Sequence, residues 1–252
     1  MKIDLSGRIA LVTGGSRGIG RAIAVRLGGC GARVAVNYVR HTRAAEETAD
    51  MIRDAGGEPF TVRANLAKHE QIWRLCGALS ERWGERLDIL VSNAASGVIK
   101  PALELTEHHW DWTMGINAGT LLPLTQCASA RMPAGSSIVA VSSLGALRAI
   151  PMYAAVGASK AALESLVRHL AIELAERGIR VNAVSAGVVE TDALKHFPNR
   201  DDIIGNSRVK TPAGRLTEPQ DVADVVLFLV SDLAKMVLGQ TVIVDGGYST
   251  LA

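Results

Sequence analysis

Hydrophobic positions follow two alternating patterns along the chain. Short apolar runs have the length and composition of buried strands, and they cover 8–13, 34–38, 58–63, 87–92, 136–141, 179–185 and 241–244. Between them, apolar residues recur every three or four positions, the period of an α-helix. These predicted helices cover 21–27, 42–55, 68–84, 103–131, 154–174 and 217–231. The alternation predicts an α/β fold, a doubly wound parallel sheet of about seven strands with helices on both faces.

The 252 residues are expected to form one domain, because the chain shows no repeat, low-complexity stretch or linker. In such a fold, ligands bind at the carboxyl ends of the strands. The one long stretch without clear periodicity is 191–211. Long irregular segments in compact domains often cover a site, so we expect a substrate lid here.

Composition narrows the classes of function. Hydrophobic residues make up 48%, aromatic residues 4%, and the net charge is +2, which favours neither nucleic-acid nor membrane binding. Asp4 and Arg8 interrupt any signal-like apolar stretch, so a cytoplasmic protein is predicted. The scattered cysteines Cys30, Cys76 and Cys127 are expected to be reduced, buried thiols. Neither cysteines nor histidines show metal-ligand spacing, so no metal site is predicted.

A glycine-rich turn, 14–20, lies between the first strand and the first helix. That context is what a dinucleotide-binding turn requires, since its glycines let backbone N–H groups approach a pyrophosphate. The second strand carries Asn37 where an acid often binds the ribose of NAD, and Arg17 and Arg40 lie nearby in the sequence. Arginines suit a 2′-phosphate, so the sequence favours NADPH over NADH.

Tyr153 and Lys160 are seven residues apart on the predicted central helix, which Pro151 would open. Seven residues at ~100° each make about two turns, so both side chains are expected on one face. A nearby ammonium lowers the pKa of a phenol, and such a phenol can donate a proton or hydrogen bond to developing negative charge. The alternative is an ordinary surface tyrosine and a solvated lysine.

Taken together, these motifs resemble the short-chain dehydrogenase/reductase superfamily over the whole chain. The residues that carry the resemblance are Thr13, Gly14, Gly18, Gly20, Asn93, Ala94, Ala95, Asn117, Ser143, Tyr153, Lys160, Asn182, Gly187, Thr191 and Asp245-Gly246-Gly247. The resemblance implies an NADP-dependent oxidoreductase that is usually a homotetramer, with the last strand and the D-G-G-Y segment at the subunit contact. For Trp110 and Trp112, packing at a subunit interface is favoured over contact with the substrate.

One departure from the family pattern concerns the tyrosine. Ketoreductases of the family carry Tyr-x3-Lys, which would place the tyrosine at position 156, but this chain has Val156 there. Its Tyr153 makes Tyr-x6-Lys, the spacing of the enoyl-acyl-carrier-protein reductases. The chain looks most like the NADPH-dependent enoyl reductase III type, through N-A-A-S-G-V, H-W-D-W-T-M, T-D-A-L-K-H-F-P-N-R and T-P-A-G-R. That resemblance implies reduction of a trans-2-enoyl thioester, carried by acyl carrier protein or CoA, in fatty-acid or related biosynthesis.

The resemblance also implies roles for single residues. Tyr153 would hydrogen-bond the enolate oxygen, Lys160 would hold the nicotinamide ribose, and Asn117 would place a water against Lys160. Ser143 either orients the substrate or has no role. The predicted NADPH contacts are Gly14, Ser16, Arg17, Gly18, Ile19, Gly20, Arg40, Asn65, Leu66, Asn93, Ala94, Lys160, Val188 and Thr191.

Two other functions stay open at this point. The body of the chain also fits a 3-oxoacyl or other ketoreductase whose substrate binds in a shifted pose. A protein that binds NADPH without turnover is the alternative from another class, and the intact Asn117, Tyr153 and Lys160 argue against it. A basic patch of Lys195, Arg200, Arg208 and Lys210 would suit docking of an acidic carrier protein.

Overall fold

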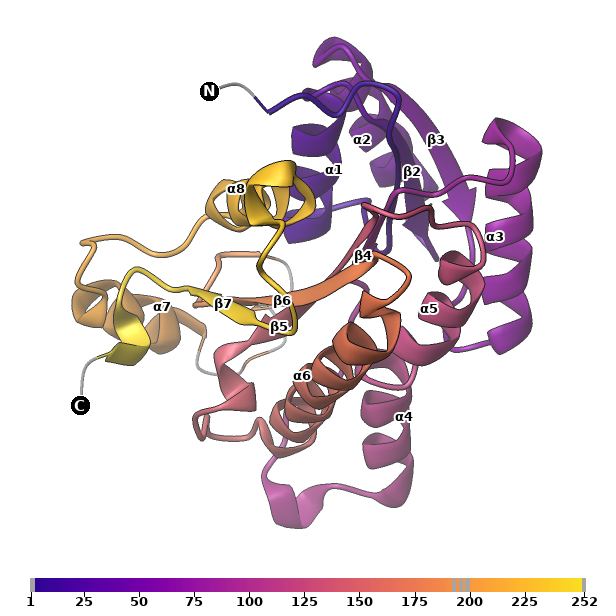
Figure 1. Ribbon diagram of the computed structural model, residues 1–252. Helices are drawn as coiled ribbons and strands as arrows, with labels where there is room; N and C mark the ends of the chain where they lie inside the picture. Colours follow the sequence, from indigo (N-terminus) through magenta and orange to yellow (C-terminus); the bar gives the residue numbers. More distant parts are fainter. Residues whose placement is uncertain (1–2, 192–193, 195–196, 198–199, 251–252) are drawn as a thin grey trace.

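The computed structural model describes residues 3–191, 194, 197 and 200–250 (Figure 1). A seven-stranded sheet of order β3-β2-β1-β4-β5-β6-β7 forms its centre, and β3 and β7 are its edges. All neighbouring strands are parallel. The strands are β1 (Ile9–Val12), β2 (Arg33–Tyr38), β3 (Glu58–Arg63), β4 (Ile89–Ser92), β5 (Ser137–Ser143), β6 (Arg180–Ala186) and β7 (Thr241–Val244). The predicted α/β fold and all the predicted strands are confirmed.

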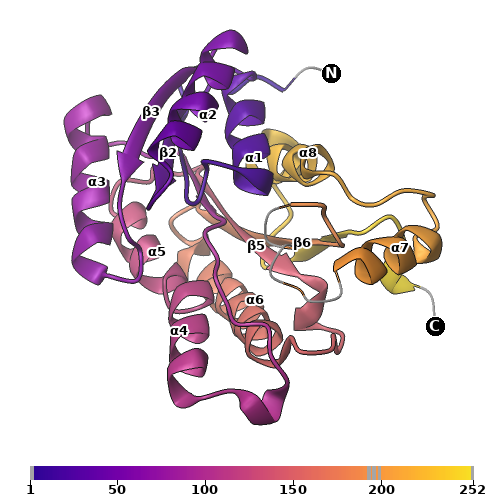
Figure 2. The ribbon, with the colours of Figure 1, turned by 180° about the vertical axis from the view of Figure 1, so that it is seen from behind.

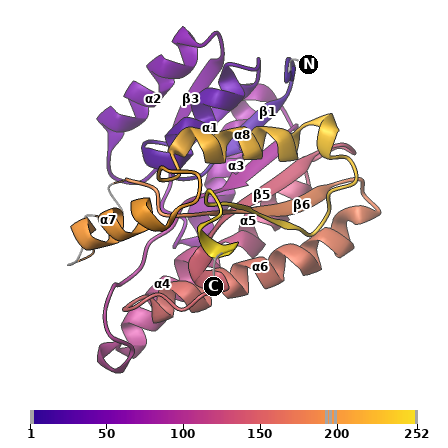
Figure 3. The same cartoon turned by 90° about the vertical axis from the view of Figure 1, so that its left-hand side faces the viewer.

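Helices cover both faces of the sheet (Figure 3). One face packs against α1 (Gly18–Gly28), α2 (Thr42–Asp54) and α8 (Pro219–Val230), through apolar residues such as Ile23, Ile52 and Val226. The other face packs against α3 (His69–Trp83), α5 (Leu121–Ser129) and α6 (Ala154–Ala175), through Ile72, Leu124 and others. The strands read as continuous apolar runs because both faces are buried.

The long predicted helix 103–131 is in fact two helices. Thr106 caps α4 (Glu107–Asn117), because its hydroxyl accepts a hydrogen bond from the N–H of His109 at 3.2 Å. The chain then turns and α5 begins at Leu121. Pro123 therefore lies in the first turn of α5, the only part of a helix that tolerates proline without losing a hydrogen bond. The predicted helical region 103–131 is therefore confirmed as helical, but it is divided between α4 and α5.

The segment 191–211 is less irregular than expected, because α7 (Arg200–Lys210) occupies much of it. Asp201 and Asp202 lie in its first turn, and Arg208 and Lys210 in its last, an arrangement that stabilises the helix dipole. Only Ser207 of this helix is buried, so no apolar periodicity marks it. Positions 192–193, 195–196 and 198–199 of the predicted lid lie outside the described residues.

A disulfide joins Cys76 of α3 to Cys127 of α5, so the prediction of three reduced thiols is wrong for this pair. Both helices pack on the same face of the sheet, which brings the two Cα atoms to 6.5 Å, within disulfide range. Cys30 is free and half-buried. Within the described part of the chain, no helix combines the length and the apolar character needed to cross a membrane.

Candidate active site

The predicted site residues come together at the carboxyl edge of the sheet. The glycine turn follows β1, Asn93 follows β4, Ser143 ends β5 and Gly187 follows β6. Figure 2 shows the segment after β4 running in front of α6 on its way to α4. This edge is therefore the place where a nucleotide and a substrate can meet.

Asn93 fixes the glycine turn from the neighbouring strand. Its backbone N–H donates to the Thr13 hydroxyl at 2.9 Å, and its side-chain Nδ2 donates to the carbonyls of Thr13 and Gly14 at 2.9 and 3.1 Å. A Cβ on Gly20 would lie 2.3 Å from the Gly14 oxygen and 2.4 Å from Asn93 Nδ2, so only glycine fits there. Gly14 and Gly18 have positive φ, which L side chains rarely adopt. The turn is a close-fitting backbone cradle of the kind that a pyrophosphate requires.

Asn37 supports the same turn from β2 and does not face the solvent. It is buried, its Oδ1 accepts from the Gly14 N–H at 3.4 Å, and its Nδ2 donates to the Ala64 carbonyl at 3.1 Å. Asn37 thus shapes the glycine turn from β2, and the preference for NADPH that the sequence suggests rests on Arg17 and Arg40. Asn65 and Leu66 follow β3, where the Asn65 N–H donates to Gln71 Oε1 at 2.6 Å and Leu66 is buried.

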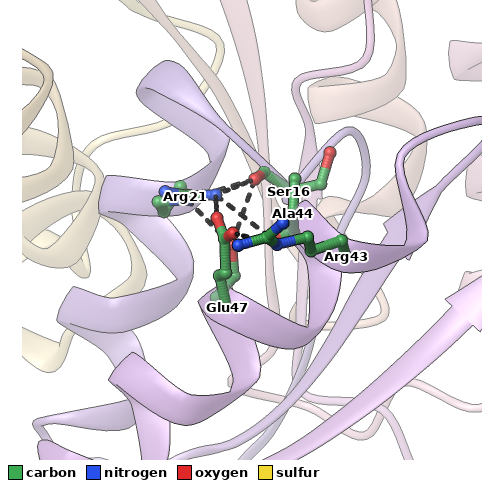
Figure 4. A network of polar contacts seen from close by, with 6 residues as sticks. Ser16, Arg21, Arg43, Ala44 and Glu47 are labelled. Atoms are coloured by element: carbon green, nitrogen blue, oxygen red, sulfur yellow. Dashed lines mark hydrogen bonds and ion pairs between the residues drawn. The ribbon is translucent and has the colours of Figure 1, made fainter.

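Arg21 is a residue that the sequence analysis missed, although it directly follows the last glycine of the turn. Its Nη2 donates to the carbonyls of Ser16 and Ala44 at 2.7 and 3.0 Å, and it pairs with Glu47 at 3.3 Å (Figure 4). Glu47 also pairs with Arg43 at 3.3 Å. Arg21 thus ties the glycine turn to the start of α2. The predicted phosphate-binding Arg17 and Arg40 are exposed, Arg17 in that turn and Arg40 just before α2.

Tyr153 lies one residue before α6, not on the helix as predicted. The preceding Met152 has φ 61°, a left-handed conformation that costs an L residue roughly 1–2 kcal/mol. The Tyr153 hydroxyl lies 3.4 Å from Ser143 Oγ, so the structure brings these two predicted residues together. A Cβ on Gly145 would lie 2.5 Å from the Tyr153 ring. The ring therefore occupies space that any side chain at position 145 would fill.

Lys160 is buried on α6, where its Nζ donates to the Val141 carbonyl at 2.8 Å. Burial lowers the pKa of Lys160 to about 8, and the charge of Glu164 opposes that change. Burial also raises the pKa of Tyr153, while the Ser143 hydrogen bond opposes the rise. The expected lowering of the Tyr153 pKa by Lys160 is therefore wrong: burial of the phenol sets the direction, and the group that opposes the rise is Ser143.

Val156 occupies the position where ketoreductases of the resembling family carry the tyrosine. Its side chain is buried, and a Cβ on Gly97 would lie 2.4 Å from its Cγ2. Asn117 holds the same loop against α6: its Oδ1 accepts from the Ser96 N–H and its Nδ2 donates to Ser159 Oγ, both at 2.9 Å. The Asn117 side chain thus orients the loop after β4, and its predicted water-binding role stays a prediction.

The segment after β6 covers the site from the other side. The ring of Phe197 stacks on Tyr153 with 6.0 Å between centroids and 27° between planes. Thr191 Cγ2 lies 3.4 Å from the position that a Cβ would take on Gly18, so the predicted contact Thr191 borders the glycine turn. Val188, two residues after the end of β6, is half-buried.

The predicted basic patch is only partly described. Lys195 lies outside the described residues, Arg200 pairs with Glu190 at 2.6 Å, and Arg208 and Lys210 are exposed.

The fold and the residues at the carboxyl edge of the sheet are those of a dinucleotide-dependent oxidoreductase. They include a parallel sheet, a glycine cradle after β1, and a tyrosine, a serine and a lysine at that edge. Comparison with known proteins identifies the family to which the chain belongs. The family described as enoyl-(acyl carrier protein) reductase, adh_short_C2, matches residues 14–249. The chain belongs to the short-chain dehydrogenase/reductase family and is an NAD(P)-dependent reductase of it.

Relatives of this chain reduce different groups. The 1-cyclohexenylcarbonyl-CoA reductase of Streptomyces collinus is 40% identical over 97% of this chain and 88% of its own length. The hydroxynaphthalene reductase-like protein Arp2 of Metarhizium majus is 36% identical over 98% and 97%. Among solved structures, the promiscuous reductase LugOII, which catalyses keto-reduction at C1 in lugdunomycin biosynthesis, is 39% identical over 97% of this chain and 98% of that one, with a TM-score of 0.89.

Proposed function

We propose that this chain is an NADPH-dependent enoyl-thioester reductase. Its substrate is a trans-2-enoyl thioester on acyl carrier protein or CoA, and its product is the saturated acyl thioester. The observation that carries the proposal is the place of the phenol. The phenol comes from Tyr153, the residue before α6, and position 156 holds a buried valine packed against Gly97.

The displaced phenol suits the chemistry of an enoyl thioester. In carbonyl reduction, the oxygen that needs a proton is bonded to the carbon that receives hydride. In enoyl reduction hydride goes to the β-carbon, and negative charge develops at the thioester carbonyl oxygen, three bonds away and so two bonds further than in carbonyl reduction. A hydrogen-bond donor moved by three residues, about one helical turn or ~5 Å, can meet that more distant oxygen while the cofactor keeps its place.

The cofactor supplies the hydride when it is bound, and the residues present fit it. Gly14 and Gly18 have positive φ and Gly20 has no room for a Cβ, which gives the tight glycine turn between a strand and a helix on which a pyrophosphate binds. In this proposal the Tyr153 hydroxyl donates to the enolate oxygen and Ser143 orients Tyr153 or the thioester. A proton from solvent then adds to the α-carbon and gives the saturated thioester. Lys160 would hold the nicotinamide ribose hydroxyls. Arg17 and Arg40 favour NADPH over NADH because their guanidinium groups suit a 2′-phosphate.

The relatives support two candidate reactions. The name of the cyclohexenylcarbonyl-CoA reductase describes an unsaturated acyl thioester as substrate, which favours enoyl reduction here. Ketone reduction is the second candidate. LugOII performs a keto-reduction, and the 3.4 Å contact between Tyr153 and Ser143 keeps the serine–tyrosine pair that carbonyl reduction uses.

The test is conversion of crotonyl-CoA to butyryl-CoA, followed by NADPH oxidation and mass spectrometry. Tyr153→Phe is expected to lose at least about 100-fold in kcat and to bind NADPH as the wild type does. The matched control Tyr248→Phe should keep the wild-type rate, because Tyr248 lies in the C-terminal turn after β7. Full activity of Tyr153→Phe would contradict the assigned role. Tight NADPH binding with no turnover of any enoyl or keto thioester would identify a sensor instead.

A further inference from the structure

Glu164 is a buried acid that the proposed mechanism does not use. It lies on α6 one helical turn after Lys160 and is 4% exposed. Its Oε1 accepts a hydrogen bond from Ser142 Oγ at 2.6 Å, and Ser142 directly precedes Ser143 on β5. A buried carboxylate is costly unless it is hydrogen-bonded and its charge is offset.

Other buried acids of the described chain have evident partners. Asp88 pairs with Arg8 at 3.2 Å and with Arg86 at 2.8 Å. Asp245 accepts from the backbone N–H groups of Gly247 and Ser249 at 2.9 and 2.8 Å. Glu164 accepts a hydrogen bond from the hydroxyl of Ser142. It follows Lys160 by four residues, a spacing that puts both on one helix face, and its charge acts on Lys160 to raise the pKa of the ammonium.

Lys160 and Glu164 meet few other charges among the described residues. The packed elements β5, α5 and the short turn η2 (Leu144–Ala146) contain no charged residue. Arg180 at the start of β6 donates instead to the carbonyls around Leu229 and Ser231. Tyr153 is a further titratable group near this pair. The other titratable side chains of the packed helices are half-buried or exposed: on α4 Glu107, His108, His109 and Asp111, and on α6 Arg168, His169 and Glu173.

We propose that Glu164, held in place by Ser142, is a positioning residue that keeps Lys160 protonated in its buried site. The inference rests on the role that the proposed function gives Lys160. A lysine that holds ribose hydroxyls and supports a tyrosine donor is useful as an ammonium, which needs a fixed negative charge once it is removed from water. Ser142 supplies the restraint that keeps the carboxylate turned into the protein.

The sign of the effect follows from the charges. Lysine is charged below its pKa, and the pKa of Lys160 is about 8 with Glu164 present. Without the carboxylate, burial acts alone and the pKa falls further. The protonated fraction of Lys160, and the activity that depends on it, is then lost at a lower pH than in the wild type.

The experiment is an NMR titration of the Cε signal of Lys160 in full-length protein labelled with 13C-lysine, assigned with Lys160→Met. Glu164→Gln keeps the size and hydrogen-bonding ability of the side chain, and is expected to lower the titration midpoint by about one pH unit. Ser142→Ala should lower it in the same direction by less, so the idea stays testable if Glu164→Gln does not fold. Glu173→Gln, the same change at an exposed position of α6, should leave the midpoint unchanged.

This titration needs no substrate, so its outcome is independent of whether the chain reduces enoyl thioesters. Where turnover is measured, the upper limb of the pH profile of kcat/KM should move down with the NMR midpoint, and Glu164→Asp should restore part of it. An unchanged Lys160 midpoint in Glu164→Gln, or in Ser142→Ala if that is the variant recovered, would overturn the proposal.

Discussion

Two neighbours determine where the Tyr153 phenol lies. Met152 turns the backbone with a positive φ just before the tyrosine, and its carbonyl accepts from the Lys100 N–H at 3.0 Å. Gly145 then leaves room for the ring. Strained backbone near a functional group persists only where its surroundings hold it. The position of the hydroxyl beside Ser143 is thus a property of this local arrangement and not of the helix alone.

Gly145→Ala tests that arrangement. The added methyl would lie 2.5 Å from the ring, so Tyr153 must move, and we expect kcat/KM for an enoyl thioester to fall by about tenfold or more. Gly77→Ala is the matched control, because a Cβ at position 77 meets nothing within 4 Å. Wild-type kcat/KM in a folded Gly145→Ala variant would contradict the importance of the ring position.

At the scale of single residues, the sequence predicts which residues belong to the site better than it predicts their conformations. Tyr153 and Ser143 do come together, because the strand and the helix that carry them follow from local apolar patterns. Lys160 lies on α6 as predicted, where its Nζ contacts the Val141 carbonyl. That Tyr153 precedes α6, and that Asn37 turns inward, depends on long-range contacts with β5 and β3 that no local pattern records. Arg21 was missed because its partners, Ala44 and Glu47, lie on another helix.

Among the elements, the segment after β6 is where substrate selection is expected. Phe197 stacks on Tyr153, and thereby covers part of the tyrosine ring. Stacked aromatic pairs contribute about 0.5–1.5 kcal/mol beyond the burial of their area. The same contact helps to explain why burial raises the pKa of Tyr153.

Phe197→Ala is therefore expected to raise KM for an enoyl thioester by about tenfold and to leave the NADPH dissociation constant within about twofold. Steady-state kinetics and fluorescence titration with NADPH measure the two quantities. Phe228→Ala serves as control, since Phe228 lies on α8 and is 37% exposed. Equal effects of both substitutions on KM would show that the stacking on Tyr153 has no part in substrate binding.

Strands and most helices follow from the sequence because apolar periodicity is a direct record of burial. The two departures have physical reasons. Helix α7 buries only Ser207 and so leaves no periodic trace. The turn between α4 and α5 interrupts a region whose apolar pattern is nearly continuous, and Pro123 was the available signal.

At the scale of the whole molecule, unpartnered apolar groups lie on two surfaces. Ile243 on the edge strand β7 is 42% exposed, and Trp110 and Trp112 on α4 are 43% and 38% exposed. Large exposed apolar side chains of this kind often mark interfaces. The homotetramer that the family resemblance implies, with the last strand as a subunit contact, stays a prediction.

Sedimentation velocity tests the assembly. The wild type is expected to sediment as a tetramer, and Ile243→Lys as a smaller species, because a charge would be buried at the contact. Met51→Lys, on α2 at a comparable 44% exposure, should leave the tetramer intact. A monomeric wild-type protein, or an Ile243→Lys variant that stays tetrameric, would contradict the expected contact.

The central claim is that the place of Tyr153 makes this enzyme an enoyl reductase. The most direct measurement is NADPH oxidation with crotonyl and acetoacetyl thioesters side by side, each on CoA and on acyl carrier protein. The account predicts oxidation with the crotonyl thioester and at least about tenfold lower kcat/KM with the acetoacetyl thioester, a difference of about 1.4 kcal/mol in transition-state binding. Oxidation with the acetoacetyl thioester alone would contradict it and would show that the ketoreductase-like body decides the reaction.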